Sequence, residues 1–380
     1  MISSSKARRP TIINMDGNFA IPVQHSGAVQ VKDQHDARDR SDASCPGLPG
    51  SRAGRNLALD FTKGLLVLLM VLYHWINYFV SQQGDFYKYL RFITPSFIFI
   101  TGFLIANVYL AKYAIDDPRL YKRLIQRGVK LLAIFTLLNL AVAVLAARGA
   151  GATNSGIGTF LHNAGSTYLT GNGRTAAFTV LVPISYLLIL SPALLLLYRW
   201  HRNFPLAACG LLFLAIYILK LNGVVLGHLE LFTIGVLGLV LGRVPIEKIN
   251  RVARFPFYLA AAYVAYLIAL SIWQEIYPLQ VVGVCLSLLL MYVIGVKSGE
   301  AGCVQSRIIV LGQYSLLAYI VQIGVVLLLS KALRQLNLGH ATLLISFFGA
   351  FALTIAAIEV VARTRTKSRI VDRLYKSLFA

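Results

Sequence analysis

Long apolar runs recur along the chain between residues 57 and 362, and each is about the length of a membrane-crossing helix. About 20 apolar residues in an α-helix cross a hydrocarbon core of about 30 Å. The runs are continuous and lack the alternation of a transmembrane β-barrel. The pattern predicts an all-α, polytopic membrane protein. The ten predicted spans are Leu57–Val80, Tyr89–Ala111, Gly128–Ala147, Ala177–Tyr198, Pro205–Leu221, Val224–Gly242, Phe255–Trp273, Tyr277–Val296, Ile308–Ser330 and Ala341–Ala362.

Composition and charge agree with a membrane protein. The 380 residues are 57% hydrophobic and 13% charged, against about 25% charged in soluble domains. The net charge of +21 is compatible with a nucleic-acid ligand, but its distribution favours membrane topology. With a cytoplasmic N-terminus, 28 of the 36 Lys and Arg residues fall in inner segments and seven in outer segments. This asymmetry follows the positive-inside rule and predicts two cytoplasmic termini and no nucleic-acid partner.

The chain divides into three predicted regions. Residues 1–54 are polar and contain no apolar core of a signal peptide, so we expect a disordered cytoplasmic tail. Residues 55–365 form the membrane domain, and residues 366–380 form a basic cytoplasmic segment. The four cysteines lie in the tail, in two spans and in an inner loop, and no ligand spacing typical of a metal site is present. We therefore predict neither a disulfide framework nor a metal site.

The first span carries three ionisable residues, Asp60, Lys63 and His74. Lys63 and His74 are eleven residues apart, about three helical turns, so both lie on one stripe of the helix. Asp60 precedes Lys63 by three residues and falls on the same side. Because ionisable groups inside a membrane are costly and usually face a partner, a cavity or a substrate path, this stripe is a candidate functional site.

A cationic ridge lies between the second and third spans. Arg119, Arg123 and Arg127 follow the helix-start signal Asp117-Pro118 at intervals of four residues. Arginine matches phosphate geometry, so the ridge can bind a phosphorylated cofactor such as coenzyme A. The same ridge can equally anchor the protein to anionic lipid.

A second ionisable pair, His228 and Glu230, begins the sixth predicted span from its outer side. Residues two apart do not face each other on a helix, so the two side chains should meet different neighbours. One of them can share an outer cavity with His74. Alternatively, both lie at the interface and are solvated.

Several motifs in this chain resemble the acyltransferase-3 superfamily of membrane acyltransferases. Leu59-Asp60-x-x-Lys63-Gly64 followed by His74 resembles its opening motif, although Lys63 stands where Arg is commoner. Segments similar to later motifs, and in particular to the OpgC-like branch of glucan succinyltransferases, are Pro95–Phe103, the Arg119/Arg123/Arg127 ridge, Leu181–Tyr186 with Pro192, Phe232–Gly238 and Leu311–Gln322. The resemblance extends over about residues 55–330 in order.

This resemblance implies transfer of an acyl group, acetyl or succinyl, from cytoplasmic acyl-CoA to a hydroxyl. The acceptor would be a cell-envelope glycan or a lipid-linked sugar at the inner membrane. Acyl-CoA is then a substrate, and no permanently bound cofactor is expected.

The resemblance also suggests roles for individual residues. His74 would be the general base or a transient acyl carrier, since histidine titrates near neutral pH. Lys63, paired with Asp60, would attract the donor phosphates or polarise its thioester. Arg119, Arg123 and Arg127 would hold the nucleotide end of the donor. Asn77, Tyr78 and Arg91 would lie near the acceptor, as would His228 and Glu230.

Two other classes of protein remain alternatives. An intramembrane Asp, Lys and His set also suits a proton-coupled secondary transporter, but the sequence shows no inverted repeat or paired broken helices. The buried charges argue against a purely structural or sensory protein. Acyl transfer from acyl-CoA by the purified protein supports the enzyme, whereas solute uptake without CoA supports the transporter.

Overall fold

The computed structural model describes residues 56–80, 86–113, 115–149, 155–171, 178–273, 276–298, 302–336 and 341–379. Across these ranges every regular element is a helix, which confirms the all-α prediction. The predicted tail of residues 1–54 lies outside the described residues. Within the predicted C-terminal segment, residues 369–379 form an amphipathic helix.

The helices begin and end at residues with recognisable physical roles. The Asn56 side chain accepts a hydrogen bond from the Leu59 backbone N–H at 3.1 Å and caps the first helix. Asp117 likewise caps the third span through the Arg119 N–H at 2.8 Å. In order, the helices are α1 (Leu57–Trp75), α2 (Tyr87–Leu90), α3 (Ile93–Leu104), α4 (Leu110–Lys112), α5 (Pro118–Gly149), α6 (Ser155–His162), α7 (Leu181–Trp200), α8 (Phe204–Leu221), α9 (Gly227–Leu241), α10 (Ile246–Val252), α11 (Pro256–Ile272), α12 (Tyr277–Ser298), α13 (Cys303–Gln313), α14 (Ser315–Leu336), α15 (Ala341–Lys367) and α16 (Arg369–Phe379). Three π-helical segments accompany them: η1 (Ile76–Val80), η2 (Ile105–Tyr109) and η3 (Ser166–Thr170).

Eight of the helices described are long and apolar enough to cross a membrane, so the protein is a multi-pass membrane protein. Helices α9 and α10 are bent by 99° at a short break, and together they make a ninth candidate span. The predicted span Phe255–Trp273 corresponds to α11, an apolar helix of 17 residues. Each predicted span therefore overlaps an observed apolar helix.

One predicted span is wrong in its continuity. The run Ile308–Ser330 was expected as a single helix, but the structure divides it at Tyr314 into α13 and α14. The reason lies in how α13 packs. A Cβ atom on Gly312 would lie 1.7 Å from the Asp60 carbonyl oxygen, and one on Gly64 would lie 1.9 Å from the Ile308 carbonyl oxygen. Glycine at both positions lets α13 lie directly against α1, and the break frees α14 to follow its own direction.

Close backbone contact also joins α3 to α9. A Cβ atom on Gly102 would lie 1.9 Å from the Gly235 carbonyl oxygen, and one on Gly238 would lie 2.1 Å from the Phe99 carbonyl oxygen. Any larger side chain at these positions would push the two helices apart. The glycines of the Phe232–Gly238 motif therefore have a packing function.

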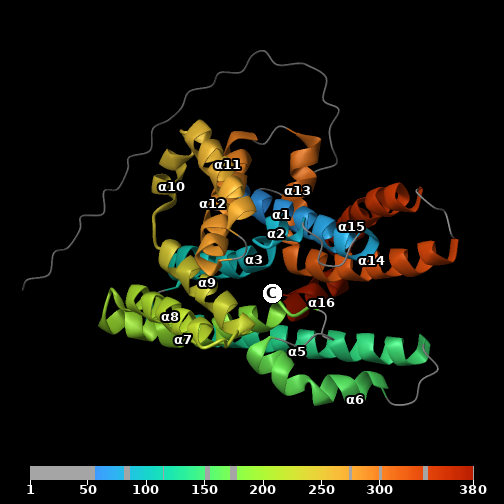
Figure 1. The fold of residues 1–380 in the computed structure, drawn as a ribbon, viewed down its shortest axis with the longest axis horizontal. Helices are drawn as coiled ribbons and strands as arrows, with labels where there is room; N and C mark the ends of the chain where they lie inside the picture. Colours follow the sequence, from blue (N-terminus) through green and yellow to red (C-terminus); the bar gives the residue numbers. More distant parts are fainter. Residues whose placement is uncertain are drawn as a thin grey trace, which may run out of the picture. The chain divides into compact units, whose positions relative to one another are not determined.

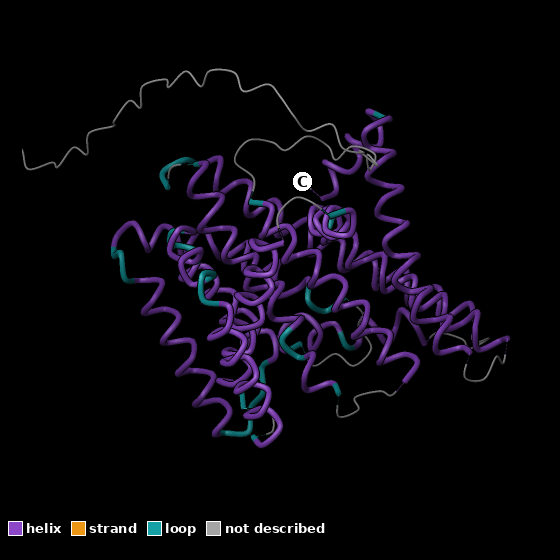
Figure 2. Tube along the Cα trace, turned by 90° about the horizontal axis from the view of Figure 1, so that it is seen from above, coloured by secondary structure: helices purple, strands orange, loops and turns teal. Residues whose placement is uncertain are grey.

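The helices form two groups that share α3. Helices α12, α13 and α14 pack against α1, and α15 packs against α14; we call these the α1 group. Helices α5, α7, α8 and α9 form the α5 group. Figure 1 shows the α1 group above and the α5 group below, with α16 between them, and Figure 2 shows the same helices from above. Helix α3 contacts α1, α7, α9 and α12, so it connects the two groups.

Candidate functional site

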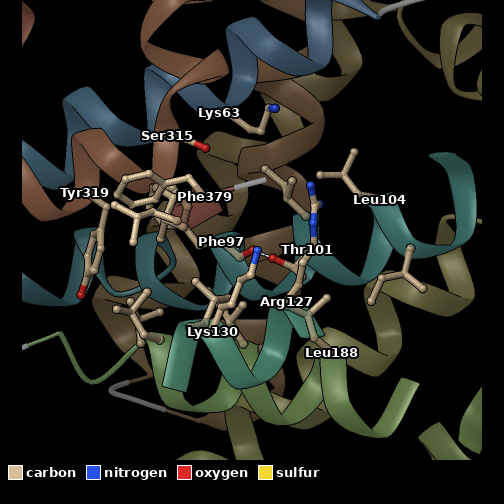
Figure 3. Close-up of a pocket in the computed structure, with 18 of the residues that line it drawn as sticks. Lys63, Phe97, Thr101, Leu104, Arg127, Lys130, Leu188, Ser315, Tyr319 and Phe379 are labelled. Carbon is tan, nitrogen blue, oxygen red and sulfur yellow. Dashed lines mark hydrogen bonds between the residues drawn. The ribbon is translucent and has the colours of Figure 1, made fainter. Parts of the chain in front are cut away.

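A cavity of about 230 Å³ lies between the two helix groups. Its walls are largely apolar and come from α1, α3, η2, α5, α7, α14 and α16. Three cationic side chains line it: Lys63, Arg127 and Lys130. In Figure 3, Lys63 enters from one side, while Arg127 and Lys130 enter from the opposite side. We call this space the Lys63 cavity.

Lys63 is held at the cavity by an ion pair that the sequence predicted. Its Nζ lies 2.6 Å from the Asp60 Oδ1, and the exposed fractions of the two side chains are 16% and 5%. The packing of Gly64 and Gly312 places this turn of α1 against α13. Since both charges are largely out of water, each limits the cost of burying the other. Asp60 itself does not line the cavity.

The arginine ridge does not act as one surface. Arg127 lines the Lys63 cavity and donates a hydrogen bond to the Tyr109 hydroxyl. Arg123 instead donates to the Tyr113 hydroxyl and stacks over that ring at 5.2 Å. Arg119 is exposed and does not line the cavity. Only the last arginine of the predicted set therefore reaches this cavity.

Lys130 and the hydroxyl residues of the cavity were not among the site residues predicted from the sequence. Lys130 follows Arg127 by three residues, so it lies on the same face of α5. The hydroxyl side chains are Thr101, Tyr109, Ser315 and Tyr319. The sequence does contain a signal for these hydroxyl residues. They are isolated polar residues on apolar helices, and three of them lie within the motifs quoted above.

Helix α16 closes part of the cavity. Leu378 and Phe379 line it, and Figure 3 shows the Phe379 ring beside Ser315 and Tyr319. The helix is joined to α15 through Asp372, which accepts a hydrogen bond from Arg365 at 2.6 Å; Asp372 also pairs with Lys376 of the same helix at 2.5 Å. These two cations, Lys376 first, hold the pKa of Asp372 below its ordinary value.

His74 lies at the other end of α1. Eleven residues of α-helix separate it from Lys63, a rise of about 17 Å. It is half-buried and its ring meets the Tyr73 ring edge-on at 5.2 Å. His74 does not line the Lys63 cavity, so the predicted stripe is present on α1 but its two ends occupy different surroundings.

Met70 occupies the stripe between those ends. It lies seven residues after Lys63 and four before His74, so all three share one side of α1. Met70 is only 2% exposed and belongs to the same buried cluster as Tyr319 and Ile323. Met70 therefore lies along α1 between Lys63 and His74, packed within the core of the protein.

The predicted acceptor residues lie around the His74 end. Asn77 and Tyr78 are in η1, which begins two residues after His74. Tyr78 packs against a small cluster formed by Val71, Val326 and Ala350. Arg91 directly follows α2 and is exposed. No described contact joins these three residues to one another.

His228 and Glu230 meet different neighbours, as their spacing predicted. His228 is buried, with Nε2 2.7 Å from the Thr167 carbonyl oxygen of η3. The Glu230 carboxylate pairs with Lys220 at 2.9 Å. Neither residue lines the Lys63 cavity, and neither lies with His74 in a described cavity.

A second cavity, of about 250 Å³, has different chemistry. It lies between α1, α3, α9, α10 and α12, and its lining is almost entirely apolar. Ile100 contributes to the walls of both cavities. Within the described ranges, no group of His, Cys, Asp and Glu side chains could hold a metal ion. The Lys63 cavity is thus the more polar of the two, and its cations and apolar walls suit an elongated ligand that carries both anionic and apolar parts.

Comparison with known proteins gives one match. The family model Acyl_transf_3, described as an acyltransferase domain, matches residues 56–360. No curated protein and no solved structure matches the chain. The matched region includes α1 through most of α15, and it contains every residue of the Lys63 cavity except those of α16.

Proposed function

Because this chain belongs to the Acyl_transf_3 family of acyltransferases, we propose that it transfers an acetyl or succinyl group from cytoplasmic acyl-CoA to a hydroxyl. The acceptor is a cell-envelope glycan or a lipid-linked sugar, as in the OpgC-like branch. The enzyme lies in the inner membrane with ten spans and both termini in the cytoplasm. The family match and the membrane-spanning helices support a membrane acyltransferase; the donor, the acceptor and the number and orientation of the spans are proposed.

The observation that carries the donor assignment is the cationic lining of the Lys63 cavity. Arg127 and Lys130 come from α5, and Lys63 faces them from α1. Coenzyme A carries several phosphate charges at one end and a long, weakly polar arm that ends in the thioester. Three cations beside apolar walls complement such a molecule. We therefore place the phosphates at Arg127 and Lys130, with Lys63 beside them.

The thioester then points along α1 toward His74. The arm of coenzyme A is comparable in length to the rise of about 17 Å between Lys63 and His74. To pass between them it must displace Met70, a flexible side chain suited to repacking. This arrangement separates donor recognition from the reacting atoms.

At His74 the reaction is an ordinary acyl transfer. The imidazole takes the proton of the acceptor hydroxyl while that oxygen attacks the thioester carbonyl carbon. The carbon–sulfur bond breaks, and the coenzyme A thiolate leaves and takes up a proton. In the alternative sequence the imidazole attacks first and carries the acyl group to the acceptor.

A transfer assay tests the proposal. The purified protein in nanodiscs receives radiolabelled acetyl-CoA or succinyl-CoA and an extract of envelope glycans. The His74→Ala variant should fold and bind donor but transfer label about 10²–10⁴-fold more slowly, the usual contribution of a general base. The matched control is His201→Ala, which removes an exposed histidine after α7. Full activity of His74→Ala would exclude His74 as the base or carrier.

The acceptor needs a separate measurement. Mass spectrometry of envelope glycans from a deletion strain should show the loss of one acyl mass, and that mass identifies the acyl group. An unchanged glycan profile, together with CoA-independent solute uptake by the purified protein, would favour the transporter.

A further inference from the structure

Gln322 on α14 carries a buried side-chain amide. Its exposed fraction is 0%, and neither Oε1 nor Nε2 has a partner among the described residues. Buried polar groups are normally paired, and each unsatisfied group costs about 1–3 kcal/mol. Asn139 on α5 shows the usual solution, since its buried amide donates to the Phe135 carbonyl oxygen at 3.0 Å. The unpaired amide of Gln322 therefore requires an explanation.

The position of Gln322 relates it to the Lys63 cavity. Ser315 and Tyr319 line that cavity, and Gln322 follows them on α14 at positions i+7 and i+3. At about 100° per residue, all three lie within about 60° on one face of the helix. Gln322 is about 4.5 Å farther along α14 than Tyr319. It thus continues the cavity-lining face beyond the end of the cavity.

Gln322 lies beside the part of α1 between Lys63 and His74, because Ala318 and Val326, four residues before and after it, share small buried clusters with Val67 and Val71 of α1. Helix α14 packs against α1. Met70 is in this part of α1. A ligand arm that leaves the cavity and displaces Met70 would therefore pass between the α1 stripe and Gln322.

We propose that Gln322 forms a subsite that binds the amide-containing arm of the acyl-CoA donor. The inference rests on the proposed function, because it concerns the same donor. A side-chain amide has two N–H donors and a carbonyl acceptor. It can accept from an amide N–H of the arm and donate to an amide or thioester carbonyl. Gln322 is a positioning residue here, and the His74 chemistry is unchanged.

The energetics of this subsite differ between the free and the bound protein. Without donor, the buried amide has no hydrogen bond to the part of the chain that the structure describes, so it destabilises the fold. With donor bound, the amide becomes satisfied and the cost is removed. An arm without amides would leave it unsatisfied, so the subsite selects an amide-bearing thioester over a simple apolar chain.

The test combines stability with ligand binding in Gln322→Leu. Leucine has a similar length and no polar atoms, so this variant should have a higher Tm than the wild type in the absence of ligand. Its affinity for acetyl-CoA should fall about 10–100-fold, the cost of removing one or two hydrogen bonds and leaving the donor amide unpaired. Its affinity for 3′,5′-ADP, which carries nucleotide phosphates but no arm, should not change.

Ser287→Ala is the matched control. The Ser287 hydroxyl on α12 is also buried without a partner among the described residues, but it lines neither cavity. This control should raise Tm and leave acetyl-CoA binding unchanged.

The outcomes separate the two proposals. If Gln322→Leu lowers Tm, or if it binds acetyl-CoA as tightly as the wild type, the subsite is excluded while the proposed function stands. An equal loss of affinity for acetyl-CoA and 3′,5′-ADP would also exclude it. If the wild type itself binds no acetyl-CoA, the proposed function fails and the subsite with it.

Discussion

Lys63, near the start of α1, and His74, in its last turn, lie on one side of a single helix but in contrasting surroundings. Lys63 is ion-paired with Asp60 and faces two further cations across a cavity. His74 meets the Tyr73 ring edge-on, lines neither described cavity, and is followed two residues later by the π-helical η1. The proposed function assigns two tasks to this stripe: charge recognition at the Lys63 end and proton transfer at the His74 end.

π-Helical segments lie next to both His74 and the Lys63 cavity. Among the described residues, η1 follows His74, and η2 carries Tyr109, which accepts a hydrogen bond from Arg127. The third π-helical segment, η3, supplies the Thr167 carbonyl oxygen to His228. Such π-helical turns are rare and often mark functional positions.

The largest expected effect is on stability at the Lys63 end. Lys63→Gln leaves the largely buried Asp60 carboxylate without its ammonium partner, which should cost about 3 kcal/mol and lower Tm. The double variant Asp60→Asn/Lys63→Gln removes both charges and should recover most of the lost Tm. If the double variant also recovers acyl transfer, Lys63 only balances Asp60. If transfer stays low in a stable double variant, Lys63 acts on the donor.

The second prediction tests whether the donor arm passes from the Lys63 cavity to His74. Met70→Trp should fill the space through which the donor arm passes and slow acyl transfer by about 10²-fold, the typical cost of misplacing a reacting group. Binding of 3′,5′-ADP should not change, because the Lys63 cavity remains open. Met70→Leu, which nearly conserves volume, is the control. Normal transfer in a folded Met70→Trp protein would mean that the donor does not pass this point.

A smaller effect on donor binding is expected when single arginines of the ridge are replaced. Arg127→Gln should weaken acetyl-CoA binding about 10–100-fold, because a charge-assisted hydrogen bond contributes about 1.5–3 kcal/mol. Arg119→Gln removes an equal charge from an exposed position outside the cavity and should leave binding unchanged. Isothermal titration of both variants checks this. Equal losses in the two variants would indicate a diffuse lipid anchor instead of a donor site.

The smallest effect concerns α16. The lowered pKa of Asp372 means that its ion pairs stabilise the docked helix above the ordinary carboxyl pKa. This stabilisation should disappear as pH falls through the lowered pKa. Asp372→Asn should reproduce the loss at neutral pH. Hydrogen exchange should then be faster in residues 369–379 than in the wild type, with α14 unaffected as the internal reference.

The sequence predicted those parts of the fold that depend on local composition. Apolar length located the membrane helices, and the spacing of Asp60 and Lys63 predicted their ion pair. The break at Tyr314 was not predicted in this way, because the apolar residues before and after Gly312-Gln-Tyr-Ser315 together have the length of one membrane span. Its cause is the contact of Gly312 with α1, which is distant in sequence.

Of the cations that line the Lys63 cavity, Lys63 and Arg127 were predicted as site residues from the sequence, whereas Lys130 was not. A spacing of four residues correctly put the ridge arginines on one helix, yet the orientation of α5 against α7 decides which of them reaches the cavity. That orientation leaves Arg119 outside and brings in Lys130. The contributions of Thr101 and Ser315 likewise depend on the meeting of α3, α14 and α5.

The most direct test of the central claim is the location of the bound donor. A photoreactive coenzyme A analogue, cross-linked to the protein in nanodiscs and mapped by peptide mass spectrometry, should label residues 97–104 of α3 and residues 127–131 of α5. Excess acetyl-CoA should prevent the labelling, and Arg127→Gln should reduce it. Labelling confined to helices outside the Lys63 cavity, or labelling that acetyl-CoA does not compete away, would contradict the assignment of the donor site.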